Sequence, residues 1–156
     1  MLRIVFAFCA VLGVSITVHA DEVTYRKDIR PIWEQKCAFC HGASAPYLGD
    51  FLDDQKKFEA MLKGPRMDTY ADLIFFVDWP DTGALMRRLD DGKGTSDGKP
   101  GNMYVNLGAT EEEREKNLKL FKKWVGKDAW KFNRWNAKGK APAITKEDLD
   151  KIQVKY

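Results

Sequence analysis

The chain has 156 residues, with 26 Lys or Arg and 23 Asp or Glu, so its formal net charge is only +3 at pH 7. A charge this close to balance, without a repeat of basic and aromatic residues, argues against a protein that binds nucleic acid. The length is that of a single domain that can bury a substantial hydrophobic core.

Residues 1–20 have the features of a secretion signal that is cleaved. Arg3 supplies a positive start, residues 4–18 are almost entirely apolar, and Val18-His19-Ala20 places small residues where a signal peptidase cuts. We expect cleavage after Ala20. A retained membrane anchor is the alternative, but the apolar run is shorter than the ~20 residues that a spanning helix needs. The sequence therefore predicts an exported protein without stable membrane insertion after cleavage.

Residues 24–36 are predicted to form the first helix of the mature chain. Its apolar residues, Ile29 and Trp33 among them, recur at helical spacing. Pro31 lies inside this pattern, so the helix either begins near Asp28 with proline in its first turn or is kinked at the proline.

The next five residues, Cys37-Ala38-Phe39-Cys40-His41, form the pattern C-x-x-C-H, which is the attachment signature of a c-type haem. Two thiols three positions apart on a helical turn can each form a thioether with one vinyl group of the porphyrin, and His41 can then bind the iron. A Cys-x-x-Cys redox pair would require a βαβ context, and a structural zinc site would require four Cys or His ligands. The chain has neither.

Between this motif and residue 90 the sequence predicts one loop and three short helices. The loop covers residues 42–49, and the helices cover residues 53–62, 70–77 and 82–89. Gly64-Pro65 ends the first helix and Trp79-Pro80 ends the second. Residues 70–77 also fit a buried strand by pattern alone, but their context favours a helix.

His41 is the only histidine outside the leader, so no second histidine of the chain can be the sixth iron ligand. The single C-x-x-C-H motif also predicts one haem and no second. The ligand is expected among four methionines: Met61, Met67, Met86 and Met103. If none of them binds, the position is filled by an unusual group, such as a lysine or the new amino terminus, or stays open.

Met103 is the preferred candidate because it follows a long polar segment, residues 92–102, that is too rich in glycine for a helix or central strand. A methionine on such a loop can fold across a haem face, and ligation by Met and His raises the haem potential. Met61 and Met86 fall in predicted helices, where methionine usually fills the core. Met67 follows a turn and remains a second candidate.

The strongest helix signal covers residues 110–126, where Thr110 and Glu113 form a capping box and Gly126 ends the helix. Residues 127–156 then form a C-terminal extension that is rich in aromatic and basic side chains. We expect its aromatic residues to pack back onto the domain, with a docking surface as the alternative. Thr145 is predicted to cap a short helix over residues 144–149.

Together these features resemble class I cytochrome c over residues 24–126. Met103 lies 62 residues after His41, a separation common in longer members of that family, and Trp33 matches the aromatic residue of the family's first helix. The resemblance implies an all-α, cytochrome c-like domain around one covalent haem c over residues 21–126. It also implies a proline whose carbonyl orients the haem histidine, and Pro46 is the nearest candidate.

The resemblance further implies a periplasmic monohaem cytochrome that is not itself an enzyme. It would exchange single electrons with redox partner proteins, as a soluble carrier or as the electron-transfer subunit of a complex. The alternative is a haem enzyme or gas-binding sensor with an open or displaceable sixth position. Peroxidase-type chemistry usually needs a distal acid–base group, most often histidine, and no second histidine remains after cleavage.

Overall fold

The structure is a computed structural model that describes residues 22–93, 95, 97–133 and 144–156. All elements in these ranges are helices, which confirms the predicted all-α class. The predicted signal peptide lies outside the described residues. None of the described helices has both the length and the apolar character needed to cross a membrane.

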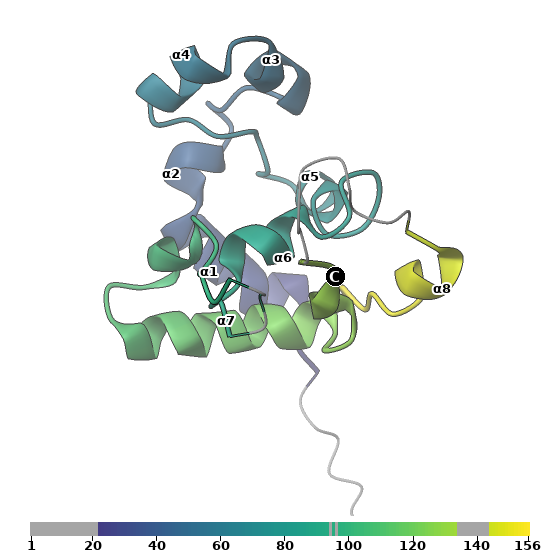
Figure 1. Ribbon diagram of the computed structural model, residues 1–156. Coiled ribbons are helices and arrows are strands. Elements are labelled where there is room, and N and C mark those ends of the chain that lie inside the picture. The colour runs from purple at the N-terminus through teal and green to yellow at the C-terminus, as the bar shows by residue number, and fades with distance from the viewer. Residues whose placement is uncertain (1–21, 94, 96, 134–143) are drawn as a thin grey trace, which may run out of the picture.

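The helices form a main body and a smaller lobe (Figure 1). The lobe consists of α3 (Leu48–Asp53) and α4 (Gln55–Ala60), at the top of the view, and α2 (Ala38–His41) lies between the lobe and the body. The body contains α1 (Arg30–Lys36), α5 (Tyr70–Phe75), α6 (Ala84–Leu89) and the long α7 (Glu111–Val125). The C-x-x-C-H turn is therefore at the junction of lobe and body.

The first helix is built in two parts. The Thr24 hydroxyl accepts a hydrogen bond from the amide of Lys27 and caps a π-helical turn, η1 (Tyr25–Ile29), which continues directly into α1. Pro31 occupies the first turn of α1, where its missing N–H costs no helical hydrogen bond. Of the two predicted arrangements, the structure therefore shows proline in a first turn, with the π-helical turn before it.

The lobe differs from the prediction in two places. The loop predicted over residues 42–49 is too long, because α3 already begins at Leu48. The helix predicted over residues 53–62 is confirmed as α4 but is shorter at both ends: the chain leaves helical geometry at Asp54 (φ −142°, ψ 61°), where the carboxylate accepts the amide hydrogen of Lys57 and starts α4. Aspartate favours this arrangement because its side chain competes with the backbone for helical hydrogen bonds.

The helices predicted over residues 70–77 and 82–89 are confirmed, each two residues shorter. Thr69 caps α5 by accepting the amide hydrogen of Asp72. The start of α6 is delayed to Ala84 because Gly83 has a positive φ of 82°, a left-handed conformation that ends the preceding turn. A short 3-10 helix, η2 (Tyr104–Leu107), follows the glycine-rich segment.

The predicted helix over residues 110–126 is confirmed as α7, with one change at its start. The Thr110 hydroxyl accepts the amide hydrogen of Glu113 (3.2 Å), as expected. The Glu113 carboxylate, however, accepts from the amide of Ala109 (2.7 Å), one residue before the expected partner. The inner face of α7 is buried and packs on η1 and on the rest of the core, through Leu118, Phe121, Trp124 and Val125.

The C-terminal extension contains η3 (Ala129–Asn133) and α8 (Lys146–Leu149). Thr145 caps α8 as predicted, and the rest of that element's capping box comes from Asp148. Beyond α8 the chain returns to the body: the Lys155 carbonyl accepts both the amide hydrogen of Tyr25 and the indole N–H of Trp124. Another aromatic residue of the extension, Trp135, lies outside the described residues.

Candidate haem site

The C-x-x-C-H motif folds as one tight helical turn. The Cys37 carbonyl accepts the amide hydrogens of Cys40 (3.2 Å) and His41 (3.0 Å), and both cysteines are partly buried with free thiols. Burial, with a smaller contribution from Cys40, raises the pKa of the Cys37 thiol to about 12. A redox-active Cys-x-x-Cys pair needs a thiol with a lowered pKa, so this environment argues against that interpretation.

The imidazole of His41 is held by a backbone carbonyl. Its Nδ1 lies 2.7 Å from the carbonyl oxygen of Pro65, which can only accept, so Nδ1–H donates and the lone pair of Nε2 is left for a metal. Pro46, the only nearby candidate for this role by sequence, does not have it, because its carbonyl accepts the amide hydrogen of Arg66. The lobe loops out between the motif and Pro65 and brings this later proline back to the ring.

Electrostatics favour the neutral ring. Burial lowers the pKa of His41, and the positive charge of Arg88 lowers it further, against the opposing effect of the Pro65 hydrogen bond. Neutral imidazole is the form that binds a metal.

The segment that ends in Met67 closes over the motif. The amide of Gly64 donates to the carbonyl of Cys40 (3.0 Å), and the amide of Met67 donates to the carbonyl of His41 (2.8 Å). The His41 ring lies directly on Gly64, where an added Cβ would be 2.2 Å from the ring carbon Cε1. Only glycine therefore fits at this position with the ring where it is.

Gly64→Ala tests this contact. We expect the methyl group to displace the imidazole, to lengthen the bond to Pro65 and to destabilise the protein by about 1–3 kcal/mol, the usual cost of overpacking. Urea unfolding and the visible spectrum of the haem-loaded protein measure both effects. Gly49→Ala is the matched control, because a Cβ there meets no atom within 4 Å. Equal stability and equal spectra for the two variants would contradict a tight contact between Gly64 and the His41 ring.

The four candidate methionines have different surroundings. Met86 is fully buried in the core, as predicted for a gap-filling residue. Met61 was also expected in the core, but it is 56% exposed, and neither α3 nor α4 has a buried residue. Met67 is partly buried beside the backbone of His41.

Met103 is partly buried and arrives on a different segment. Its amide donates to the carbonyl of Arg88 (2.9 Å), in the last turn of α6, and its thioether sulfur lies 3.6 Å from the side-chain amide nitrogen of Asn106. Arg88 is also the residue whose charge lowers the pKa of His41. The segment that carries Met103 is therefore anchored to a part of the body that acts electrostatically on the histidine.

The residues present fit a covalently attached haem. The turn offers two free thiols and a neutral histidine with one nitrogen available. One turn before Cys37, on the same helical face, the indole N–H of Trp33 is buried and has no hydrogen-bond partner in the described part of the chain. A buried donor without a partner is expected where a protein wall faces a group that the chain itself does not supply.

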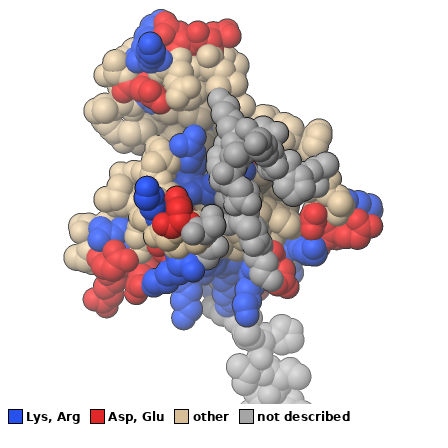
Figure 2. Space-filling view, in the orientation of Figure 1, with Lys and Arg blue, Asp and Glu red and all other residues tan. Residues whose placement is uncertain are grey.

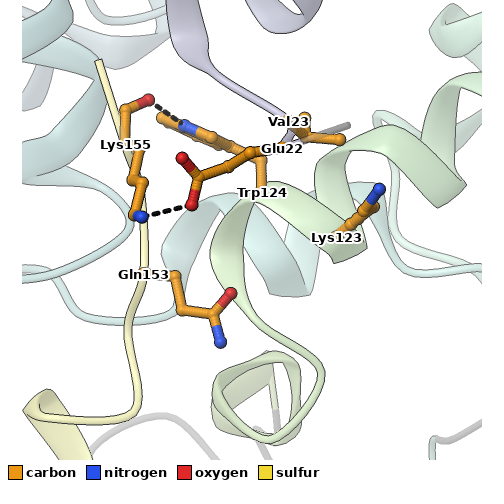
Figure 3. Close-up of a pocket in the computed structure, with 6 residues that line it drawn as sticks. All are labelled: Glu22, Val23, Lys123, Trp124, Gln153 and Lys155. Carbon is orange, nitrogen blue, oxygen red and sulfur yellow. Dashed lines mark hydrogen bonds and ion pairs between the residues drawn. The ribbon is translucent and has the colours of Figure 1, made fainter. Parts of the chain in front are cut away.

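One surface pocket lies away from these residues, where the two described ends of the chain meet (Figure 3). Trp124 and Val23 form its apolar side, and an ion pair between Glu22 and Lys155 crosses it. None of its lining residues belongs to the C-x-x-C-H turn or is a candidate methionine. It therefore contributes nothing to the haem site.

A helical domain with one C-x-x-C-H turn and a histidine oriented by a carbonyl defines the class of monohaem c-type cytochromes. The chain belongs to the PccH cytochrome c family, whose model matches residues 24–156. It is similar to the monohaem cytochrome PccH from Geobacter sulfurreducens, with 57% identity over 86% of this chain and 99% of that one, and a TM-score of 0.75. No curated protein sequence matches the chain.

These comparisons confirm the predicted c-type cytochrome and its cofactor, one covalently bound haem c. They also place the chain among electron-transfer proteins. The family match runs through residues 127–156, so it includes the part of the chain that extends beyond the region resembling class I cytochrome c.

Proposed function

We propose that this cytochrome is a periplasmic one-electron carrier in which Cys37 and Cys40 hold the haem and His41 and Met103 are the axial ligands. The observation that carries the proposal is the hydrogen bond from His41 Nδ1 to Pro65, which commits one ring nitrogen to the protein and leaves the other for iron. With His41 and Met103 both bound to it, the iron of a bound haem would have no open position for a substrate.

Met103 is favoured over Met67 by position. Met67 is tied to the His41 backbone by the segment whose Pro65 carbonyl holds the ring, so it would stay beside the histidine when haem is bound. Met103 comes from a separate segment bonded to α6. Its thioether is a soft, neutral ligand that favours Fe(II) and so raises the potential.

The protein's part in electron transfer is to hold the iron site still. The haem supplies the reversible Fe(III)/Fe(II) couple when bound. The Pro65 carbonyl and Gly64 fix the orientation of the His41 ring, and the bond from Met103 to Arg88 fixes the other ligand's backbone. Ligands that keep their places in both oxidation states leave little rearrangement to slow electron transfer.

Redox partners are proposed to be proteins, and the face of the molecule in Figure 2 carries side chains of both charges. Figure 2 shows basic and acidic side chains side by side on the lobe, whereas several basic side chains gather near the middle of the lower edge of the body, with acidic ones to either side. Lys93 could attract an acidic partner, but its side-chain nitrogen is paired with the carboxylate of Glu115 at 2.8 Å. A docking rate that falls as salt is added would indicate that the basic side chains of the lower edge steer an acidic partner.

The carrier proposal is tested by potentiometric titration of the purified haem-loaded protein, followed by addition of carbon monoxide to the reduced form. We expect a single reversible one-electron transition and a spectrum that carbon monoxide leaves unchanged. Stoichiometric carbon monoxide binding would contradict the carrier and support a haem enzyme or gas sensor instead.

Export is tested separately by cell fractionation and amino-terminal sequencing of the red protein. The proposal expects a periplasmic product that begins at Asp21 and a leaderless variant without covalent haem. A cytoplasmic haem-loaded product, or one retaining residues 1–20 in the membrane, would contradict it.

A further inference from the structure

We propose that Trp130, in the C-terminal extension, is a positioning residue for the loop that carries Met103. Its indole N–H donates to the buried carboxylate of Asp90, the residue at which this loop leaves α6. The inference rests on the proposed function in so far as Met103 is the sixth ligand. It assigns to the extension a role in ligand retention that the haem motif does not require.

The loop is closed by backbone bonds at its two ends. Asp90 follows α6, and its carbonyl accepts the amide hydrogen of Gly101 (2.8 Å), two residues before Met103. The amide of Met103 donates in turn to Arg88. Gly101 lies so close to α6 that an added Cβ would be 2.3 Å from the carbonyl oxygens of Arg87 and Arg88. The position of Asp90 therefore sets the position of the returning part of the loop.

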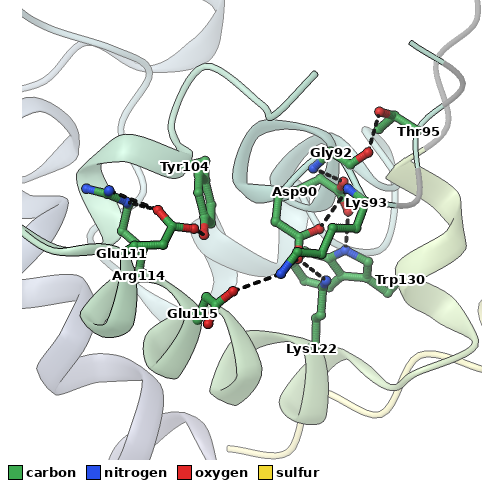
Figure 4. A network of polar contacts seen from close by, with 11 residues as sticks. Asp90, Gly92, Lys93, Thr95, Tyr104, Glu111, Arg114, Glu115, Lys122 and Trp130 are labelled. Carbon is green, nitrogen blue, oxygen red and sulfur yellow. Dashed lines mark hydrogen bonds and ion pairs between the residues drawn. The ribbon is translucent and has the colours of Figure 1, made fainter. Parts of the chain in front are cut away.

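The side chain of Asp90 is held from both sides (Figure 4). One carboxylate oxygen accepts the amide hydrogen of Gly92 (2.8 Å), within the loop, and the other accepts the Trp130 indole N–H (2.7 Å). Asp90 is only 2% exposed and Trp130 only 7%. Water cannot readily replace a donor in such a site, so losing the indole bond leaves a buried carboxylate short of a partner.

Contacts with α6 and α7 hold Trp130 in place, so that its indole can fix the position of Asp90. The chain of η3 packs against the start of α6, where a Cβ at Gly83 would be 2.4 Å from the Phe132 carbonyl oxygen. On the other side, Lys122 of α7 lies over the Trp130 ring at 5.6 Å and pairs with Asp91 at 3.3 Å. Trp130 is thus fixed to α6, to α7 and to the first residues of the loop.

The test compares Trp130→Phe with Trp124→Phe in the haem-loaded protein. Trp124 is a matched control because it is also buried and also donates its indole N–H, but to Lys155 near the end of the chain. Imidazole binding to the ferric protein, which requires displacement of the sixth ligand, is titrated in each variant. We expect Trp130→Phe to tighten imidazole binding about tenfold, as a loosened ligand loop should, and Trp124→Phe to leave it within about twofold of the original protein.

A second variant covers the case in which Trp130→Phe does not fold. Asp90→Asn keeps the shape of the side chain but replaces one acceptor oxygen with an NH₂ group. Because Gly92 and Trp130 both donate to this side chain, one of the two hydrogen bonds is then lost. We expect the same change in imidazole affinity as for Trp130→Phe. Imidazole affinity unchanged in the folded variants, or changed equally by Trp124→Phe, would overturn the inference.

Amide hydrogen exchange separates this inference from the identity of the sixth ligand. If the original protein proves not to be methionine-ligated, the proposed ligation fails, but Trp130→Phe should still speed exchange at Gly101 and Met103 more than within α7. Unchanged exchange at these two amides would overturn the coupling between Trp130 and the loop on its own.

Discussion

Replacing Cys37 or Cys40 with alanine is expected to remove most of the haem from the exported protein, and replacing both should remove all covalent haem. Each thiol supplies one thioether, and the tight turn from Cys37 to His41 presents the two together with the iron ligand. Haem staining of denatured protein and the spectrum of the reduced pyridine complex measure the number of thioethers. A single-cysteine variant that still holds haem should show the spectrum of one remaining thioether.

Phe39→Ala is the control for these variants. Phe39 lies between the two cysteines but is 72% exposed, so its removal should leave haem loading normal. Normal covalent loading of the double cysteine variant would contradict the assignment of the attachment site, whereas a loss in Phe39→Ala alone would point to the maturation machinery reading this side chain.

Met103→Leu is expected to abolish low-spin ligation by methionine and to lower the reduction potential. Loss of the neutral thioether weakens the preference for Fe(II), and a tenfold weakening equals ~60 mV for a one-electron couple. We expect a decrease of at least about this size, with loss of the weak far-red band that marks an Fe(III)–sulfur bond to methionine. Absorption spectroscopy and potentiometric titration of the same sample measure both.

Two further variants make this result specific. Met86→Leu conserves volume in a fully buried position and should change stability by less than about 1.5 kcal/mol, with the spectrum unchanged. Met67→Leu should also keep the far-red band. Retention of the band in Met103→Leu and its loss in Met67→Leu would identify Met67 as the sixth ligand and contradict the assignment of Met103.

The sequence was sufficient where local chemistry decides structure. The C-x-x-C-H turn depends only on spacing, and α7 begins and ends at the predicted cap and glycine because Thr110 and Gly126 act on their own neighbours. The cytochrome class and the all-α fold followed from these signals. In the same way, Met86 was correctly placed in the core by the pattern of α6.

The sequence was insufficient where distant segments meet. Pro65 lies 24 residues after His41, and only the course of the α3–α4 lobe brings its carbonyl to the ring, so nearness in sequence offered Pro46 as the only candidate. Met61 was misplaced because α3 and α4 form a lobe in which neither helix has a buried residue, so the helical pattern there does not mark a core. The bond between Trp130 and Asp90 joins residues 40 positions apart and leaves no periodic signal. A tryptophan predicted to pack back onto the domain was the only indication of it.

The most direct test of iron ligation by His41 and Met103 is the visible absorption spectrum of the purified exported protein, oxidised and reduced, with and without carbon monoxide. Ligation by His41 and Met103 predicts low-spin spectra in both oxidation states, the far-red band of methionine ligation in the ferric form, and no change on adding carbon monoxide. A high-spin ferric spectrum, together with a reduced form that binds carbon monoxide, would show an open iron and contradict axial ligation by His41 and Met103.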